Sequence, residues 1–224
     1  MRLMTLARFF MLFLILGMNG KLLAQENPKA NSTDAKPAPG RIVILGDSIT
    51  AGYGLDPDEA YPSILQEKIK AAGLNYVVVN AGVSGDTTAG GLRRVAWALG
   101  SGADVLVIAL GGNDGLRGTP PAETEKNLDD IIKKAKAKQP DIKIIIAGMQ
   151  MPANFGQDYV TKFRDVFPKV AKDNNAGLVP FLLEHVGGIP SLNQADRIHP
   201  TKEGQKLVAE NVWPTLEKVL KSGN

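Results

Sequence analysis

The chain has 224 residues, of which 44% are hydrophobic and 22% are charged, a composition typical of one soluble domain large enough to bury a core. Its formal charge of +3 comes from the first residues, because without residues 1–24 three of the 26 basic residues are lost and 23 remain against 23 acidic ones. A neutral chain of this kind does not indicate a nucleic-acid partner. The absence of cysteine excludes a disulfide framework, so the fold must depend on its core.

The first 24 residues have the layout of a secretory signal peptide. Arg2 and Arg8 flank a short polar start, an apolar run follows at 9–18, and Ala24 offers a small residue before a cleavage point. The run is too short to span a bilayer comfortably, so we expect export to the bacterial periplasm or medium, with no stable membrane insertion after cleavage. The alternative is an uncleaved N-terminal anchor. The polar, proline-rich residues 25–40 predict a disordered linker to a single domain at 41–224.

Short apolar runs rich in branched residues predict the strands of the domain. Pro180, within the last run, favours an edge position because proline cannot donate to a neighbouring strand. Such continuous apolar strands, separated by amphipathic helices, predict an α/β fold with a parallel sheet covered on both faces. The five predicted strands span 41–45, 76–79, 104–110, 142–147 and 178–181.

Apolar residues at helical spacing predict a helix after each strand. The third helix is expected to begin with Thr119 as a cap and Pro120 at its first position. Ala96 in the second helix and Leu207 in the last are expected to face the core. Pro214 is expected to kink the last helix or to end it early.

Ser48 follows the first predicted strand directly and is the candidate nucleophile. The carboxyl ends of parallel strands meet at one edge of the sheet, where ligands bind in open α/β folds. A serine hydroxyl needs a base, and only two histidines are present. His199 has Asp196 three residues before it, a spacing that lets the carboxylate turn back onto Nδ1 and leaves Nε2 for the serine. His185 lacks such a frame and is interpreted as structural or exposed.

Three candidate donors for a developing oxyanion arise at different strand ends. They are the backbone N–H groups of Ser48 and Gly82 and the side-chain amide of Asn113. Each follows a predicted strand, so we expect all three at the same sheet edge. Asp47 and Asp114 are interpreted as residues that tie the loop backbone beneath the site.

Four sequence blocks, in the right order, resemble those of the SGNH (GDSL) hydrolase superfamily. Their flanks are similar to its bacterial arylesterase and thioesterase I–lysophospholipase L1-like branch, and the resemblance covers about residues 40–220. The blocks are Gly46-Asp47-Ser48, Gly82, Gly112-Asn113-Asp114 and Asp196-Arg197-Ile198-His199.

The resemblance implies a three-layer α/β/α fold of flavodoxin-like type, with a mostly parallel five-stranded sheet. It implies a serine hydrolase that cleaves carboxylic esters through an acyl-enzyme, with Ser48 as nucleophile, His199 as base and Asp196 as its partner. It also assigns the oxyanion hole to Ser48, Gly82 and Asn113.

The expected substrates are small-molecule or lipid esters: aryl and acyl esters, with thioesters and lysophospholipids also considered. The branch commonly carries a Leu-Pro pair after the fourth strand, where this chain has Met151 and Pro152, a difference expected to alter acyl preference. We expect Met151, Pro152 and Phe155 to contact the substrate.

Other classes of protein remain to be weighed against the esterase. An exported carbohydrate O-deacetylase would use the same triad, although an aromatic content of 6% gives little sign of a sugar-stacking platform. A flavodoxin-like electron carrier or binding protein would share the topology but would not need the Asp-x-x-His frame. The mature chain lacks nucleotide-binding glycine motifs and metal-ligand clusters, so we expect neither a cofactor nor a metal.

Overall fold

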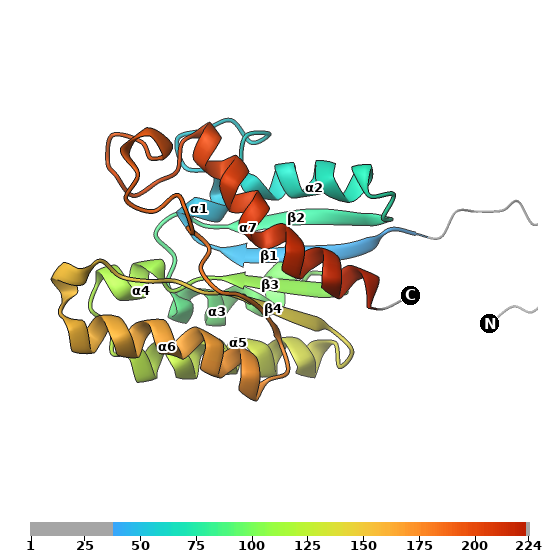
Figure 1. Ribbon diagram of the computed structural model, residues 1–224. Helices are drawn as coiled ribbons and strands as arrows, with labels where there is room; N and C mark the ends of the chain where they lie inside the picture. The colour runs from blue at the N-terminus through green and yellow to red at the C-terminus, as the bar shows by residue number, and fades with distance from the viewer. Residues whose placement is uncertain (1–37, 223–224) are drawn as a thin grey trace, which may run out of the picture. The chain divides into compact units, whose positions relative to one another are not determined.

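The structure is a computed structural model that describes residues 38–222. The signal peptide and nearly all of the linker expected from the sequence lie outside these residues. From Ala38 onwards the chain is one compact unit. Its five strands pair in parallel in the order β2-β1-β3-β4-β5, and Figure 1 shows the first four of this order. The strands are β1 (Gly40–Gly46), β2 (Tyr76–Gly82), β3 (Val105–Ala109), β4 (Lys143–Ala147) and β5 (Gly177–Val179).

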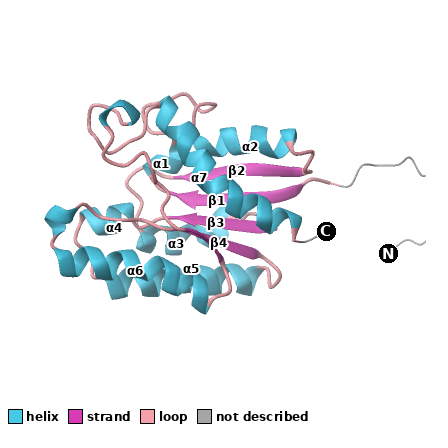
Figure 2. Ribbon diagram, viewed as in Figure 1, coloured by secondary structure: helices cyan, strands magenta, loops and turns pink. Residues whose placement is uncertain are grey.

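Helices cover both faces of this sheet and give three layers (Figures 1 and 2). Helices α2 and α7 pack together on one face, and α3, α5 and α6 pack side by side on the other. The predicted three-layer α/β/α fold is therefore confirmed. The helices are α1 (Ser48–Ala51), α2 (Tyr61–Ala71), α3 (Thr88–Ala98), α4 (Gly112–Leu116), α5 (Pro121–Lys138), α6 (Gln157–Asp173) and α7 (Lys202–Lys221), with 3₁₀ turns at Ala153–Phe155 and Pro190–Leu192.

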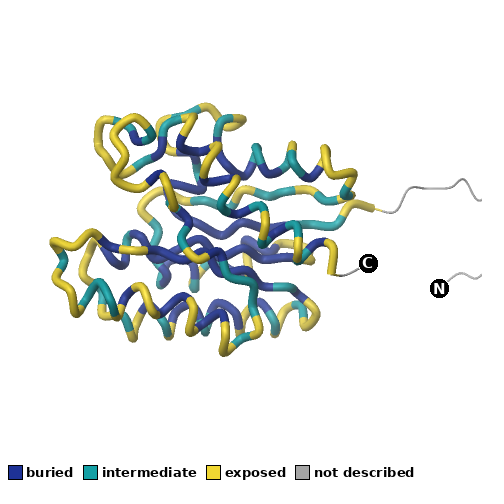
Figure 3. The backbone as a smooth tube through the Cα atoms, in the orientation of Figure 1, coloured by how far each residue is buried: buried dark blue, intermediate teal, exposed yellow. Residues whose placement is uncertain are grey.

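The core lies along the central strands, which are buried on both sides (Figure 3). All five residues of β3 are buried, as are the last five of β1. Strands covered by helices on both faces have no solvent side, so their sequences are aliphatic throughout rather than alternating. The edge strand β2 is more open, and Val77 is 44% exposed.

The strand ends differ from the expected ones by a few residues. Strand β1 begins at Gly40, which the sequence had placed in the linker, and β2 continues past the predicted end at residue 79 to Gly82. Gly82 pairs with Gly46, so the two strands end side by side. Strand β5 lies at the sheet edge, as expected, and stops just before Pro180.

Several details of the predicted helices are wrong. Helix α5 begins one residue late, with Pro120 in the capping position and no side-chain cap, so Thr119 does not cap it. Helix α7 runs through Pro214 to Lys221, which contradicts one of the two expected effects of this proline, the early end of the helix. Ala96 is exposed and Leu207 is 36% exposed, because the observed helical phase turns the neighbouring residues inward instead.

Candidate active site

Ser48 lies in a tight turn at the carboxyl end of β1. The strand ends at Gly46, and Asp47 caps α1 by accepting a hydrogen bond from the backbone N–H of Ile49 at 3.0 Å. A Cβ at Gly46 would collide with the side chain of Thr50, so the turn requires glycine here. The turn holds the Ser48 hydroxyl at the edge of the sheet, where the residue is 9% exposed.

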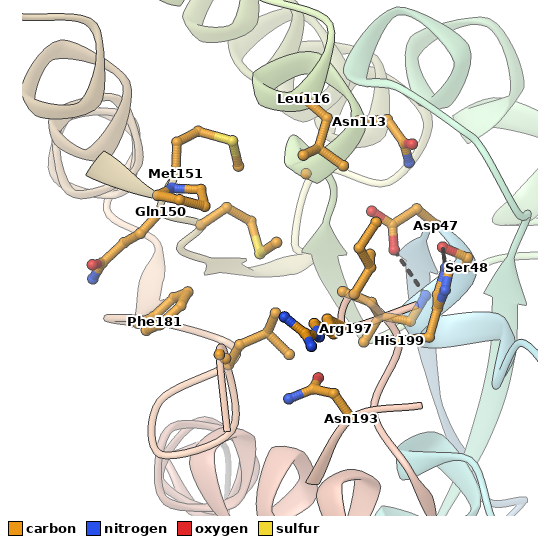
Figure 4. A pocket seen from close by; sticks show the side chains of 18 residues that line it. Asp47, Ser48, Asn113, Leu116, Gln150, Met151, Phe181, Asn193, Arg197 and His199 are labelled. Carbon is orange, nitrogen blue, oxygen red and sulfur yellow. Dashed lines mark hydrogen bonds between the residues drawn. The ribbon is translucent and has the colours of Figure 1, made fainter. Parts of the chain in front are cut away.

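A chain of hydrogen bonds joins Ser48 to the loop before α7. Ser48 Oγ lies 2.8 Å from His199 Nε2 (Figure 4), and His199 Nδ1 lies 2.6 Å from Asp196 Oδ2. The other carboxylate oxygen, Oδ1, accepts the backbone N–H groups of Ile198 at 2.9 Å and His199 at 3.0 Å. This arrangement can pass the serine proton to the imidazole while the carboxylate stabilises the resulting cation.

Contacts from Tyr53 and Gln194 hold the loop that carries His199 in place. Tyr53 packs against the imidazole, with ring centroids 4.5 Å apart and planes tilted by 37°. The Gln194 side-chain amide donates to the backbone oxygens of Tyr53 at 2.7 Å and Pro200 at 3.1 Å. The Gln194 backbone N–H donates to the backbone oxygen of His199 at 2.7 Å. These bonds fix the imidazole toward Ser48.

Two carboxyl groups near the serine have shifted pKa values in opposite directions. The hydrogen bond from His199, assisted by two backbone N–H groups, lowers the pKa of Asp196 to about 2. Burial raises the pKa of Asp47 to about 6, although the bond from Ile49 partly opposes this shift. Asp196 is therefore ionised at neutral and mildly acidic pH, whereas Asp47 gains a proton in mild acid.

Replacing Asp47 with asparagine is expected to change how stability varies with pH. Between the ordinary carboxyl pKa of 3.8 and the folded value of about 6, the folded protein holds a proton that the unfolded chain has lost. The free energy of unfolding therefore falls as pH rises, by about 3 kcal/mol for this shift. Asparagine keeps an oxygen for Ile49 and cannot ionise, so the variant lacks this fall. Urea unfolding of both proteins between about pH 4 and 7 measures the free energy of unfolding at each pH. If this free energy changed with pH in the same way in both proteins, the result would contradict a buried Asp47 that ionises in this range.

Asn113 and Gly82, two of the candidate oxyanion donors, differ in whether an N–H is left without a hydrogen-bond acceptor. Asn113 donates one amide hydrogen to the backbone oxygen of Asp86 at 2.9 Å and keeps a second for the pocket that it lines with Ser48. The Gly82 N–H instead donates to Asn80 Oδ1 at 2.9 Å, and Gly82 does not line the pocket. Gly82 can therefore meet an oxyanion only by sharing or releasing that bond.

Arg94 connects the segments that carry these donors. Its guanidinium donates to the backbone oxygens of Ala81 at 2.8 Å and Gly46 at 2.9 Å, and it forms an ion pair with Asp86 at 2.7 Å. The first two bonds hold the ends of β2 and β1, and Asp86 in turn orients Asn113. One side chain of α3 thus connects the three segments that carry the candidate donors.

A cavity of about 480 Å³ opens beside Ser48 and His199 (Figure 4). Met151 and Pro152 line it, where the sequence had placed substrate contacts. Phe155, the third expected contact, does not line it: its ring stacks on Tyr159, with centroids 6.4 Å apart, so its assignment to the pocket is corrected to packing. Apolar side chains that form the wall include Leu116, Met149, Met151, Pro152, Phe181 and Leu183.

The remaining candidate groups lie outside this arrangement. The side chain of His185 is 80% exposed, and its Nδ1 lies 3.9 Å from Glu184. Within residues 38–222, no group of three or more histidine, cysteine or acidic residues could hold a metal ion. No helix in the same part of the chain is both long and apolar enough to cross a membrane.

Comparison with known proteins identifies the family. Residues 44–207 match the GDSL-like lipase/acylhydrolase family. The chain belongs to this family. It is 44% identical over 180 residues to esterase TesA of Pseudomonas aeruginosa, covering 80% of this chain and 89% of the relative. It is 37% identical over 180 residues to thioesterase 1/protease 1/lysophospholipase L1 of Escherichia coli K12, covering 80% and 84%.

Solved structures of this family have the same fold. A crystal structure of TesA matches with a TM-score of 0.76 at 43% identity, covering 80% of this chain and 99% of that one. The esterase EstA from Pseudoalteromonas sp., in a structure inhibited by monoethylphosphonate, matches with a TM-score of 0.75 at 34% identity, covering 81% and 99%. The predicted SGNH/GDSL ester hydrolase is therefore confirmed as a class.

Four residues around the site were not assigned these contacts from the sequence. Tyr53 contacts the imidazole, Arg94 ties the strand ends, Asn80 holds the Gly82 amide, and Arg197 lines the pocket. Tyr53 and Arg197 stand inside or beside the family blocks, which was the available signal. Arg94 and Asn80 act through backbone groups, for which the sequence has no signature.

Proposed function

We propose that this family member hydrolyses carboxylic esters through an acyl-enzyme on Ser48. The observation that carries the proposal is the 2.8 Å contact between Ser48 Oγ and His199 Nε2 at the wall of an apolar cavity. Nε2 takes the hydroxyl proton as Oγ bonds to the ester carbonyl carbon. The bond from that carbon to the alcohol oxygen then breaks, and the leaving oxygen takes the proton from Nε2.

Deacylation repeats the sequence with water. Nε2 takes a proton from water as its oxygen bonds to the acyl carbon, the bond to Ser48 Oγ breaks, and Oγ regains the proton. The product is the free carboxylic acid, and Asp196 stabilises the imidazolium in both halves. The inhibition of the related EstA by monoethylphosphonate supports this chemistry, because phosphonates react with activated serines.

We assign the stabilisation of the oxyanion to the Ser48 N–H and the free amide hydrogen of Asn113. Gly82 joins them when its N–H leaves Asn80. A Cβ at Gly82 would lie 2.8 Å from the Cα of Ala51, so only glycine fits between the strand end and α1. The Ser48 N–H and the Asn113 amide are held by the fold before the reaction, so these two can stabilise the charge without reorganising as it develops.

Replacing Asn113 with alanine is expected to lower kcat by about 10²- to 10³-fold with little change in KM. The amide meets the oxygen only as charge develops, so its loss affects the transition state rather than substrate binding. Steady-state kinetics on a chromogenic ester measures both constants. The matched control is Asn211→Ala on α7, which removes amide bonds to the backbone oxygens of Leu182 and Glu184 and should lower stability without lowering kcat. An Asn113→Ala enzyme with full kcat would contradict the assignment.

The apolar wall favours acyl and aryl esters as substrates, with acyl thioesters and lysophospholipids as further members of the class. Met151 and Pro152 are proposed to contact the acyl chain. The test is hydrolysis of nitrophenyl esters from acetate to dodecanoate, beside an acyl thioester and acetylated sugars. Activity that rises with chain length beyond acetate supports this assignment. Activity confined to acetylated sugars would instead favour the O-deacetylase.

We also propose that residues 1–24 are removed on export and that the linker from residue 25 leads to the catalytic domain, whose first strand begins at Gly40. The short apolar run with its preceding arginines supports this. Mass spectrometry of protein recovered outside the cytoplasm should find a terminus near Gln25. An intact Met1 there would favour an anchor.

A further inference from the structure

Arg197 places a positive charge in the wall of the catalytic pocket. It stands between Asp196 and His199, and its side chain lines the cavity together with Phe181 (Figure 4). The described lining residues include no other arginine or lysine. Arg197 is exposed to solvent and borders the open cavity, so its guanidinium can meet a substrate that enters there.

The backbone of Arg197 has an unusual conformation for a residue with a side chain. Its φ is 61°, in the left-handed region that favours glycine. The turn holds it there: the Arg197 N–H donates to the backbone oxygen of Gln194 at 2.8 Å, and Asp196 accepts the next two N–H groups along the chain. Uncommon conformations of this kind gather at functional sites, where the surroundings fix them. The turn that forms the triad therefore also sets where the guanidinium lies.

The guanidinium has no partner of its own among residues 38–222. The adjacent Asp196 forms no hydrogen bond or ion pair with it, and the two carboxylate oxygens instead accept bonds from His199 and from the backbone. Other arginines near the site are engaged: Arg94 bonds two strand ends and an aspartate, and Arg117 donates to the backbone oxygen of Gly85 at 3.0 Å. Arg197 is thus available for a bound molecule.

The chemistry of the site determines which part of an ester meets Arg197. The apolar wall formed by residues such as Met151 and Phe181 suits the acyl chain. Nε2 of His199 must give its proton to the leaving oxygen, so the alcohol departs on the histidine side. Arg197 lies two residues from His199 and lines the same cavity, so its loop borders both the histidine and the wall near Phe181. The apolar acyl chain offers no group that a guanidinium could bind, so the charge is matched to the leaving alcohol.

We propose that Arg197 binds an anionic oxygen group, a carboxylate or a phosphate, on the leaving alcohol of the substrate. The preferred esters then join an apolar acyl group to a negatively charged alcohol. A guanidinium suits either group because its planar N–H donors can pair with two oxygens at once. The inference rests on the proposed ester hydrolysis and narrows its substrate class.

The test compares two esters that differ only in charge on the alcohol: 4-(butanoyloxy)benzoate and 4-(butanoyloxy)benzamide. For Arg197→Gln, the ratio of kcat/KM for the benzoate to that for the benzamide should fall about 5- to 30-fold relative to the parent, the effect of losing one charge-assisted bond near the surface. The variant-to-parent comparison cancels the different leaving abilities of the two alcohols. Arg197→Lys keeps the charge but loses the planar pair of donors, so it should restore only part of the ratio. Added salt should reduce the parent's preference for the benzoate.

Two further variants separate recognition from folding. Arg197→Gly removes the charge at a φ that glycine tolerates, so it should lose the same ratio while remaining folded. Arg117→Gln is the matched control, since it removes an arginine that does not line the pocket, and its ratio should equal that of the parent. A ratio that falls equally in Arg117→Gln would overturn the specific role of Arg197.

Additional substrate pairs identify the group and its position. An acylglycerol phosphate paired with the neutral monoacylglycerol tests recognition of phosphate. The pair in which Arg197→Gln lowers the charged-to-neutral ratio of kcat/KM more shows which anion is preferred. Either preference supports the proposal. An unchanged ratio in both pairs would overturn it. So would an effect confined to a nitrophenyl ester with a carboxylate at the end of its acyl chain. Hydrolysis of the benzamide ester by the parent tests the proposed function separately.

Discussion

Replacing Ser48 with alanine is expected to lower kcat by about 10⁴- to 10⁶-fold, the scale of loss when a triad nucleophile is removed. Without the hydroxyl there is no acyl-enzyme, and only residual catalysis by the oxyanion donors and by substrate binding remains. The substitution removes one oxygen bonded to His199 at a partly exposed edge, so the fold should persist. Steady-state kinetics and urea unfolding of the same preparation measure the two effects.

Covalent labelling gives an independent test of the same residue. An organophosphate should label the parent once, at Ser48, and should fail to label Ser48→Ala. Ser84 lies in a turn and Ser191 in the 3₁₀ turn Pro190–Leu192, and among residues 38–222 neither bonds to a histidine. They are the matched controls, and their alanine variants should retain activity and labelling. A label on Ser84 or Ser191 in the parent would reject the assignment of the nucleophile.

Replacing Asp196 with asparagine is expected to lower kcat by about 10⁴-fold at neutral pH, the loss seen when an orienting carboxylate of a triad becomes an amide. The backbone N–H groups of Ile198 and His199 both donate to Oδ1, so the asparagine oxygen should take that position. The amide NH₂ then faces Nδ1, which must accept rather than donate. Nε2 consequently carries the proton and cannot serve as a base for Ser48.

The pH dependence distinguishes this tautomer effect from a structural one. Because the pKa of Asp196 is lowered to about 2, its carboxylate stays ionised in mild acid, so a fall in parent activity there does not come from protonation of Asp196. The acid limb of kcat/KM should be shifted or lost in Asp196→Asn, because that substitution changes the tautomer of His199. Asn113→Ala should keep the parent's limb. An Asp196→Asn enzyme with most of its kcat and the parental limb would show that another group orients His199.

The sequence alone was sufficient for the architecture and for the triad candidates. Aliphatic strands of uniform character indicate a sheet covered on both faces, because a half-exposed strand alternates. Ser48 comes directly after such a strand, and Asp196 lies three residues from His199, so strand order and local spacing are enough to predict their meeting. Strand burial and the spacing of the triad residues depend on residues close together in the chain, so the sequence is enough to predict them.

Contacts between distant segments were decided only by the tertiary structure. Phe155 stands in the expected loop but packs on Tyr159, because a residue's direction within a 3₁₀ turn follows from packing rather than from order along the chain. The Gly82 N–H is held by Asn80, and Arg94 joins strand ends through backbone oxygens, which every residue possesses and no motif marks. The position of Arg197 in the pocket likewise depends on a left-handed turn held by bonds to its neighbours. Composition and periodicity determine which surfaces are buried, whereas the final orientation of each polar group depends on partners that only the fold brings within reach.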